Sequence, residues 1–311
     1  MPKNIKKRIT KRKTKRKTKY TLKRMNCSPA VKGKTVSRDS CLTPEILRKV
    51  KDYYNMSHPN TPITKDAPSK IWISLKQRLK TCDKEDCWLD LITDDEVRNT
   101  IDSYIFAPDQ PSSWKNKPNK WLSTNDIHKI LLQYQVSHPN FRVIRPTPLD
   151  FDAKIGEEKQ KKCVTEELCN FDLNNEINNG KTKFGLVFNL DKHDQPGSHW
   201  VALYIDADSQ ITYYMDSVGD SAPIEIQNLI GRVKEQASLI GIDITEHETH
   251  VSHQRGNTEC GMYCLYFIIT MLTGETEDTT LNTMDDRIAL FKGSRIPDKY
   301  ISEFRNKYFN T

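Results

Sequence analysis

Residues 260–272, CGMYCLYFIITML, are the feature that most limits how this chain can fold. The run carries no charged side chain, and as a helix it would be apolar on every face. It is far shorter than the ~20 apolar residues that cross a bilayer. We therefore expect a helix from Cys260 to about Leu272, buried in a protein core that other elements must supply.

The elements that could cover this helix lie upstream of it. Ser123 is placed to cap a helix whose residues Ile127, Ile130, Leu131 and Tyr134 share one face. A second helix is expected within residues 222–241. Strand-like runs occupy residues 184–190, 199–205, 210–216 and 247–253. This mixture predicts an α+β fold with a central, mostly antiparallel sheet flanked by helices.

The length of the chain suggests one main core with additional structure at its N-terminal side. A chain of 311 residues with 36% hydrophobic content can bury one core of about 200 residues, which we place at residues 100–311. Residues 39–99 are expected to form an accessory helical region. It begins with a helix capped by Thr43 and has Pro44 at its first position, followed by a helix through SKIWISLKQRLK. No motif in this region indicates a catalytic role.

The net charge of +7 hides a strong asymmetry. Residues 1–38 hold 16 Lys and Arg and no Asp or Glu, whereas the rest holds 32 basic against 41 acidic residues. This low-complexity segment is expected to be a disordered basic tail. Three interpretations stay open: a nucleic-acid-binding arm, a nuclear-import signal or a solubilising tail. An arm that neutralises about 8 phosphates would give a salt slope of about −7.

The eight cysteines favour free thiols, because no secretory signal is evident and a reducing compartment is expected. Their spacings do not match common zinc knuckles. The run HETHVSH could suggest zinc, but in a strand His250 would point away from His247 and His253. We assign no metal ligands.

Two of the expected strands place a histidine and a carboxylate together. If DADS (206–209) forms the hairpin loop, Ile205 pairs with Gln210, and His199 lies opposite Asp216. Directly opposed residues have Cβ atoms about 5 Å apart, within reach of an imidazole–carboxylate hydrogen bond. The alternatives are an ordinary surface pair, or a one-residue slip in register that would separate the two side chains.

The chemistry of this pair requires a nucleophile, for which Cys260 is the candidate. A thiol at a helix N-terminus and near an imidazolium has a lowered pKa, and Gly261 would let a substrate backbone approach. Cys264, one turn deeper, is expected to be a core residue. Gln254 and the Cys260 N–H could form an oxyanion hole. This acyl-transfer chemistry requires no cofactor.

These segments also resemble a known family. GSHWVALYID, YYMDSVGD and HQRGNTECGMYCLYFI resemble the cysteine peptidases that unite SUMO-specific proteases, the adenovirus maturation protease and the polyprotein proteases of large DNA viruses. The family's order is His-Trp, an acid, Gln and Cys-Gly, which here correspond to His199-Trp200, Asp216, Gln254 and Cys260-Gly261. The resemblance covers about residues 100–311, and WLST (121–124) is most similar to the African swine fever virus and mimivirus branch.

The resemblance implies a papain-like or adenain-like thiol endopeptidase. Its substrates would be viral structural precursors cut after Gly-Gly during virion maturation, with Trp121 and Trp200 at the substrate channel. It implies a location in the virion or in the host cytoplasm, with the nucleus as the alternative. A basic tail that binds nucleic acid would fit an enzyme packaged with a genome. The alternatives are a SUMO or ubiquitin-like isopeptidase, an acetyltransferase, and a nucleic-acid-binding virion protein with an idle site.

Overall fold

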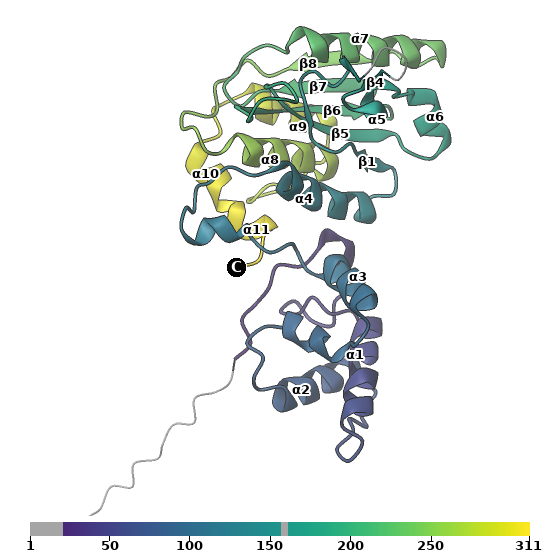
Figure 1. The fold of residues 1–311 in the computed structure, drawn as a ribbon, viewed down its shortest axis with the longest axis vertical. Coiled ribbons are helices and arrows are strands. Elements are labelled where there is room, and N and C mark those ends of the chain that lie inside the picture. Colours follow the sequence, from purple (N-terminus) through teal and green to yellow (C-terminus); the bar gives the residue numbers. More distant parts are fainter. Residues whose placement is uncertain (1–20, 157–160) are drawn as a thin grey trace, which may run out of the picture.

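The protein has a sheet-centred body, with a smaller helical region below it in Figure 1. The computed structural model describes residues 21–156 and 161–311. A six-stranded sheet runs in the order β1-β5-β6-β7-β8, with β2 also paired to β5. The β5/β6 and β6/β7 pairings at its centre are antiparallel, whereas β1, β2 and β8 join in parallel. The strands of this sheet are β1 (Phe141–Val143), β2 (Thr147–Pro148), β5 (Lys183–Asn189), β6 (Trp200–Asp206), β7 (Ile211–Met215) and β8 (Thr245–Glu248).

Helices cover both faces of this sheet, as expected for an α+β fold (Figure 1). One face packs against α4 (Thr124–Ser137), α8 (Cys260–Thr273), α9 (Met284–Lys292), α10 (Asp298–Glu303) and α11 (Arg305–Tyr308). The other face packs against α5 (Glu166–Cys169), α6 (Leu173–Asn178) and α7 (Ile224–Leu239). Every residue of β6 is buried because both of its faces are covered. A separate two-stranded ribbon joins β3 (Lys154–Ile155) to β4 (Lys162–Cys163).

Helix α8 is the buried helix that the sequence predicts. Each of its residues from Cys260 to Leu272 is buried, and Gly274 ends it in the left-handed conformation. Among the residues described, no helix combines the length and apolar character needed to span a membrane. The expected cap of α4 is also confirmed, since Ser123 and Asp126 form a reciprocal capping box.

The hairpin between β6 and β7 differs from its predicted register. Its loop is residues 207–210 and not 206–209, because Asp206 remains in the strand and pairs with Ile211. The Asp206 carboxylate accepts a hydrogen bond from the Ser209 N–H at 3.0 Å, which tightens the loop.

This difference moves the partner of each residue by two positions. His199 and Asp216 are therefore not directly opposed, and each lies just outside the end of its strand. Because side chains alternate with a period of two, a two-residue shift keeps both on one face of the sheet. His199 and Asp216 are therefore close together, as predicted, although the predicted pairing of the strands was wrong.

The accessory region begins earlier and ends later than its predicted limits. Its helices are α1 (Pro44–Ser57), α2 (Pro68–Arg78) and α3 (Asp95–Ile105). Its own hydrophobic cluster extends from Met25 to Phe106. Residues 21–38, expected to be part of a disordered tail, include the buried Val31, while residues 1–20 lie outside the described residues.

Disulfides are the clearest departure from the sequence analysis. Six cysteines predicted to be free are paired, with Cα–Cα distances of 5.1, 5.6 and 6.3 Å for Cys27–Cys41, Cys82–Cys87 and Cys163–Cys169. These distances lie in the range that a disulfide spans. The pairing depends on proximity in space, which the spacings along the chain did not reveal.

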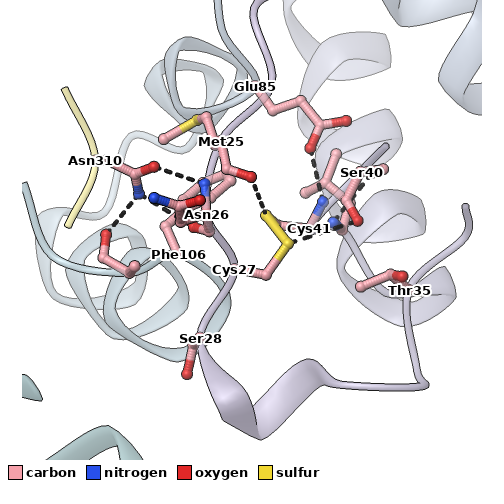
Figure 2. The surroundings of a disulfide bond; sticks show 12 residues. Met25, Asn26, Cys27, Ser28, Thr35, Ser40, Cys41, Glu85, Phe106 and Asn310 are labelled. Atoms are coloured by element: carbon pink, nitrogen blue, oxygen red, sulfur yellow. Dashed lines mark hydrogen bonds between the residues drawn. A yellow bond between two sulfur atoms is a disulfide. The ribbon is translucent and has the colours of Figure 1, made fainter. Parts of the chain in front are cut away.

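The Cys27–Cys41 bond lies beside the junction between the accessory region and the body (Figure 2). Glu85 supports it from the start of the 3-10 helix Asp86–Leu91, accepting hydrogen bonds from the Cys41 N–H at 2.9 Å and from the Trp72 indole at 2.5 Å. Burial raises the pKa of Glu85, partly offset by these hydrogen bonds.

Asn310 closes the same junction from the C-terminal side (Figure 2). Its side chain donates to the carbonyls of Asn26 (3.1 Å) and Ala107 (2.7 Å) and accepts from the Asn26 N–H (2.7 Å). Asn310 is only 4% exposed, so water cannot replace these partners. One amide therefore joins three segments that are distant in the sequence.

We expect Asn310→Ala to lower the free energy of unfolding by about 2–4 kcal/mol, because it removes three hydrogen bonds and leaves buried groups unpaired. Urea unfolding followed by tryptophan fluorescence measures the change. Asn306→Ala is the matched control: Asn306 is exposed and contributes its backbone carbonyl to Asn26, which alanine retains. Equal destabilisation by both substitutions would contradict this role for the Asn310 side chain.

Candidate active site

His199 and Asp216 form the predicted pair. His199 Nε2 lies 2.7 Å from Asp216 Oδ1, and the same oxygen accepts a hydrogen bond from the Val218 N–H at 2.9 Å. Asp216 is 1% exposed, whereas the His199 side chain is 18% exposed. The buried carboxylate thus holds the partly accessible imidazole in one orientation.

Cys260 is the third member of this group. Since Asp216 occupies His199 Nε2, the other ring nitrogen is left for Cys260, to which the His199 side chain also hydrogen-bonds. Burial lowers the pKa of His199, but hydrogen bonds to Asp216 and Cys260, and the charges of those groups, raise it to about 10. The imidazole is therefore positively charged at neutral pH.

Helix α8 places Cys260 at its first position. The first hydrogen bond of the helix runs from the Tyr263 N–H to the Glu259 carbonyl at 2.9 Å. The Cys260 N–H precedes this ladder, so it belongs to the donors that a helix leaves without intrahelical partners. A donor and a thiol thus lie together at the end of one helix.

Gln254, the candidate for the second oxyanion donor, is held in place by three hydrogen bonds. Its side-chain oxygen accepts from the Ser217 hydroxyl at 2.7 Å, and its amide donates to the Gly256 carbonyl at 2.8 Å. Its backbone N–H also donates to the Ser217 carbonyl at 2.7 Å. A side-chain amide carries two N–H groups, so a second donor remains for a developing oxyanion.

Cys264 is separated from this chemistry by one helical turn. It is fully buried, and burial raises the pKa of its thiol well above the ordinary value. Its environment matches the predicted role in the core.

Gly261 occupies a closely packed position. A Cβ at this position would lie 3.3 Å from Leu122 and 3.4 Å from both Ile127 and Trp200. The missing side chain therefore lets α8 pack closely against the start of α4 and against Trp200. The approach of a substrate backbone at Gly261 stays a prediction.

The two tryptophans assigned to the substrate channel lie in different settings. Trp200 is 7% exposed, and its indole N–H donates to the Leu122 carbonyl at 3.1 Å. Trp121 is 36% exposed, and its indole N–H donates to the Asn257 carbonyl, just ahead of the nucleophile. Trp121 is thus the more exposed of the two tryptophans.

The sequence analysis did not identify two residues near the site, Ser217 and Asp298. Ser217 orients Gln254 as described above, and its position next to Asp216 could have suggested a role. Asp298 accepts hydrogen bonds from the N–H groups of Arg255 (3.1 Å) and Gly256 (3.0 Å), which fixes the loop between Gln254 and Cys260. It follows Cys260 by 38 residues in the sequence, so no local pattern pointed to it.

The histidines considered for zinc do not come together. His253 is fully buried, with its ring nitrogens 3.0 Å from the Ile296 N–H and 3.0 Å from the Phe291 carbonyl. The predicted strand to residue 253 in fact ends at Glu248, after which the chain turns into the core. Within residues 21–156 and 161–311, no group of His, Cys, Asp and Glu has a metal-binding arrangement.

Comparisons with known proteins give the family of this domain. Residues 186–310 match the family described as "Ulp1 protease family, C-terminal catalytic domain". A thiol-protease candidate of Acanthamoeba polyphaga mimivirus is 33% identical over 188 residues, covering 60% of this chain and 58% of that protein. The chain thus matches less than two thirds of the mimivirus relative. A cysteine protease of African swine fever virus is 24% identical over 307 residues, covering 93% and 98% of the two chains.

The fold comparison agrees with these relatives. A crystal structure of the African swine fever virus protease superposes with a TM-score of 0.59 at 19% identity, covering 93% of this chain and 97% of that one. The likeness in fold therefore includes the accessory region. We conclude that residues 186–310 are similar to the catalytic domain of the Ulp1 protease family, and that the chain as a whole is similar to viral cysteine proteases.

Proposed function

We propose that this protein is a thiol endopeptidase that cleaves viral structural precursors after Gly-Gly during virion maturation. The contacts of His199 with Asp216 on one side and Cys260 on the other carry the proposal. The viral origin of the similar proteases supports the choice of substrates. The enzyme would act in the virion or in the host cytoplasm during assembly.

The proposed reaction has two steps, formation of a thioester on Cys260 and its hydrolysis. The Cys260 thiolate attacks the carbonyl carbon of the scissile bond, and the oxyanion accepts hydrogen bonds from the Gln254 amide and the Cys260 N–H. His199 gives its proton to the leaving amine, which departs and leaves a thioester. Water then attacks the thioester with His199 as base, releasing the acid and restoring the thiolate.

Selectivity for glycine would come from the channel over Cys260. The Trp121 ring lies against the loop that precedes the nucleophile, so a peptide crossing it would pass between an aromatic face and the α8 N-terminus. Residues without side chains would fit such a passage best.

A second candidate function is removal of SUMO or a ubiquitin-like protein, since some related African swine fever virus proteins are named SUMO-1 cysteine proteases. Both functions would use the same chemistry. They differ in whether a folded ubiquitin-like domain or an extended precursor segment docks next to the channel.

The basic segment at the N-terminus could add a second interaction. We propose that it binds nucleic acid and holds the enzyme near a packaged genome, because its 16 positive charges are opposed by no acidic residue within residues 1–38.

We expect Cys260→Ala to abolish cleavage, with a loss of at least about 10⁴-fold, because the nucleophile is removed. Cys264→Ala is the matched control on the same helix and should retain most of the activity. New N-termini formed in virion-precursor proteins and in a folded ubiquitin-like fusion are read by mass spectrometry. Termini after Gly-Gly in the precursors that require Cys260 support the endopeptidase. Cleavage of the fusion alone supports the second function, and equal loss from both variants would refute the assignment of the nucleophile.

We expect the basic limb of kcat/KM near pH 10 in the wild type, since His199 must carry a proton and its pKa is about 10. Asp216→Asn removes the charge that raises this pKa and replaces a charge-assisted hydrogen bond with a weaker neutral one, so the limb should move down by about 1–3 pH units. The exposed Asp220→Asn serves as control and should leave the limb in place. A limb that stays unchanged in Asp216→Asn would show that Asp216 does not set the protonation of His199.

Removal of residues 1–20 should weaken binding to duplex DNA at low salt and flatten the dependence of log K on log salt. The reason is that counterion release scales with the number of phosphates neutralised. Fluorescence anisotropy at several salt concentrations measures both quantities. The described packing of residues 21–38 with the accessory cluster is kept in this truncation. Unchanged affinity would leave the segment with no role in binding nucleic acid.

A further inference from the structure

Arg305, the first residue of α11, is a buried cation beside residues 255–259, which lead to Cys260 and are called the nucleophile loop below. It is 6% exposed, and its Nε donates to Glu259 Oε2 at 2.9 Å. Glu259 is 4% exposed and immediately precedes Cys260. A buried ion pair is a poor source of stability, because desolvation offsets its attraction. Its place next to the reacting thiol therefore calls for another explanation.

The remaining nitrogens of Arg305 connect two separate segments. Nη2 donates to the Thr258 carbonyl at 3.1 Å, and Nη1 donates to the Lys120 carbonyl at 3.0 Å. Lys120 immediately precedes Trp121, and Thr258 immediately follows Asn257. One planar guanidinium thus fixes the backbone on both sides of the contact between Trp121 and Asn257.

The position of Arg305 is itself well determined. Its guanidinium carbon lies 4.4 Å from the centre of the Trp114 ring. The Trp114 indole N–H donates to the same Lys120 carbonyl at 3.0 Å. Phe309 packs its ring against Trp114 with the ring centres 5.1 Å apart. The guanidinium therefore has little freedom to move in response to a ligand.

The charge of Arg305 is neutralised by Glu259 at close range, so it adds little net positive potential at Cys260. Its effect is on geometry. The two hydrogen bonds from the guanidinium to the Lys120 and Thr258 carbonyls set the distance between the segment of Trp121 and the loop before Cys260. Small errors in such a distance are costly, since a displacement of about 1 Å in an active site can reduce the rate about 100-fold.

We propose that Arg305 is a positioning residue that sets the opening between Trp121 and the nucleophile loop, and thereby the fit of an extended glycine-containing peptide. This inference rests on the proposed protease function. It assigns to Arg305 an effect on peptide entry and not on the reactivity of the thiolate.

Two electrophiles separate these effects in the full-length protein. Iodoacetamide is small and reports the reactivity of the Cys260 thiolate. A peptide ending in Gly-Gly-vinyl methyl ester must occupy the channel before the sulfur adds to the vinyl carbon and the neighbouring carbon takes up a proton. Peptide mapping confirms Cys260 as the labelled residue and distinguishes it from Cys264, the other free thiol among the described residues.

Arg305→Lys keeps the positive charge but loses the planar guanidinium that binds Glu259, Thr258 and Lys120 together. We expect the second-order rate with the peptide to fall about 10–100-fold, while the rate with iodoacetamide stays within about twofold. Arg287→Lys is the matched control: Arg287 binds the carbonyls of Met271 (2.8 Å) and Leu272 (3.3 Å) at the opposite end of α8. It should change both rates by less than about twofold.

Trp114→Phe provides a second variant if Arg305→Lys does not fold. It keeps a ring beneath the guanidinium but loses the hydrogen bond to Lys120, so a smaller fall confined to the peptide rate is expected. Parallel loss of both rates, or no loss of either, would overturn the role of Arg305. A wild-type protein that iodoacetamide labels but the peptide does not would instead overturn the proposed function, and with it this inference.

Discussion

Helix α8 is stable only while other elements cover its whole surface, and this requirement organises the rest of the protein. The sheet covers one side of the helix, and α4 with the C-terminal helices α9–α11 covers the others. Because these elements come from both ends of the domain, the chain must close around the helix before it is buried. The closure also fixes the helix N-terminus, where Cys260 meets His199 from the end of β6. The position of the nucleophile is thus a consequence of burying an apolar helix.

The parts of the site that the sequence predicts are those governed by local periodicity. Strand alternation brought His199 and Asp216 to one face even though the hairpin loop was misplaced by one residue, since a two-residue change in pairing preserves the face. The environment of each cysteine in α8 likewise follows from its place along a buried helix, one at the end and one inside.

The parts that could not be predicted depend on contacts between distant segments. Asp298 and Arg305 reach the nucleophile loop from α10 and α11, and no spacing near Cys260 points to either. The same holds for the paired cysteines and for the early start of the accessory region. There, buried residues such as Val31 acquire partners only when residues 29–31 fold against α3 and α4. The basic composition of residues 1–38 suggested disorder because composition does not record such long-range packing.

Buried polar groups hold the geometry of the candidate site. Those around it are Asp216, Ser217, Gln254, Glu259 and Arg305, each of which is buried. Apolar residues of similar volume would avoid the cost of desolvating these groups, so stability alone does not account for their presence. Each instead fixes a direction: the tautomer and orientation of an imidazole, the face of an amide, or the course of a loop. A site that must hold donors, a base and a thiol within hydrogen-bonding distance needs such directional contacts, because hydrophobic packing is not directional.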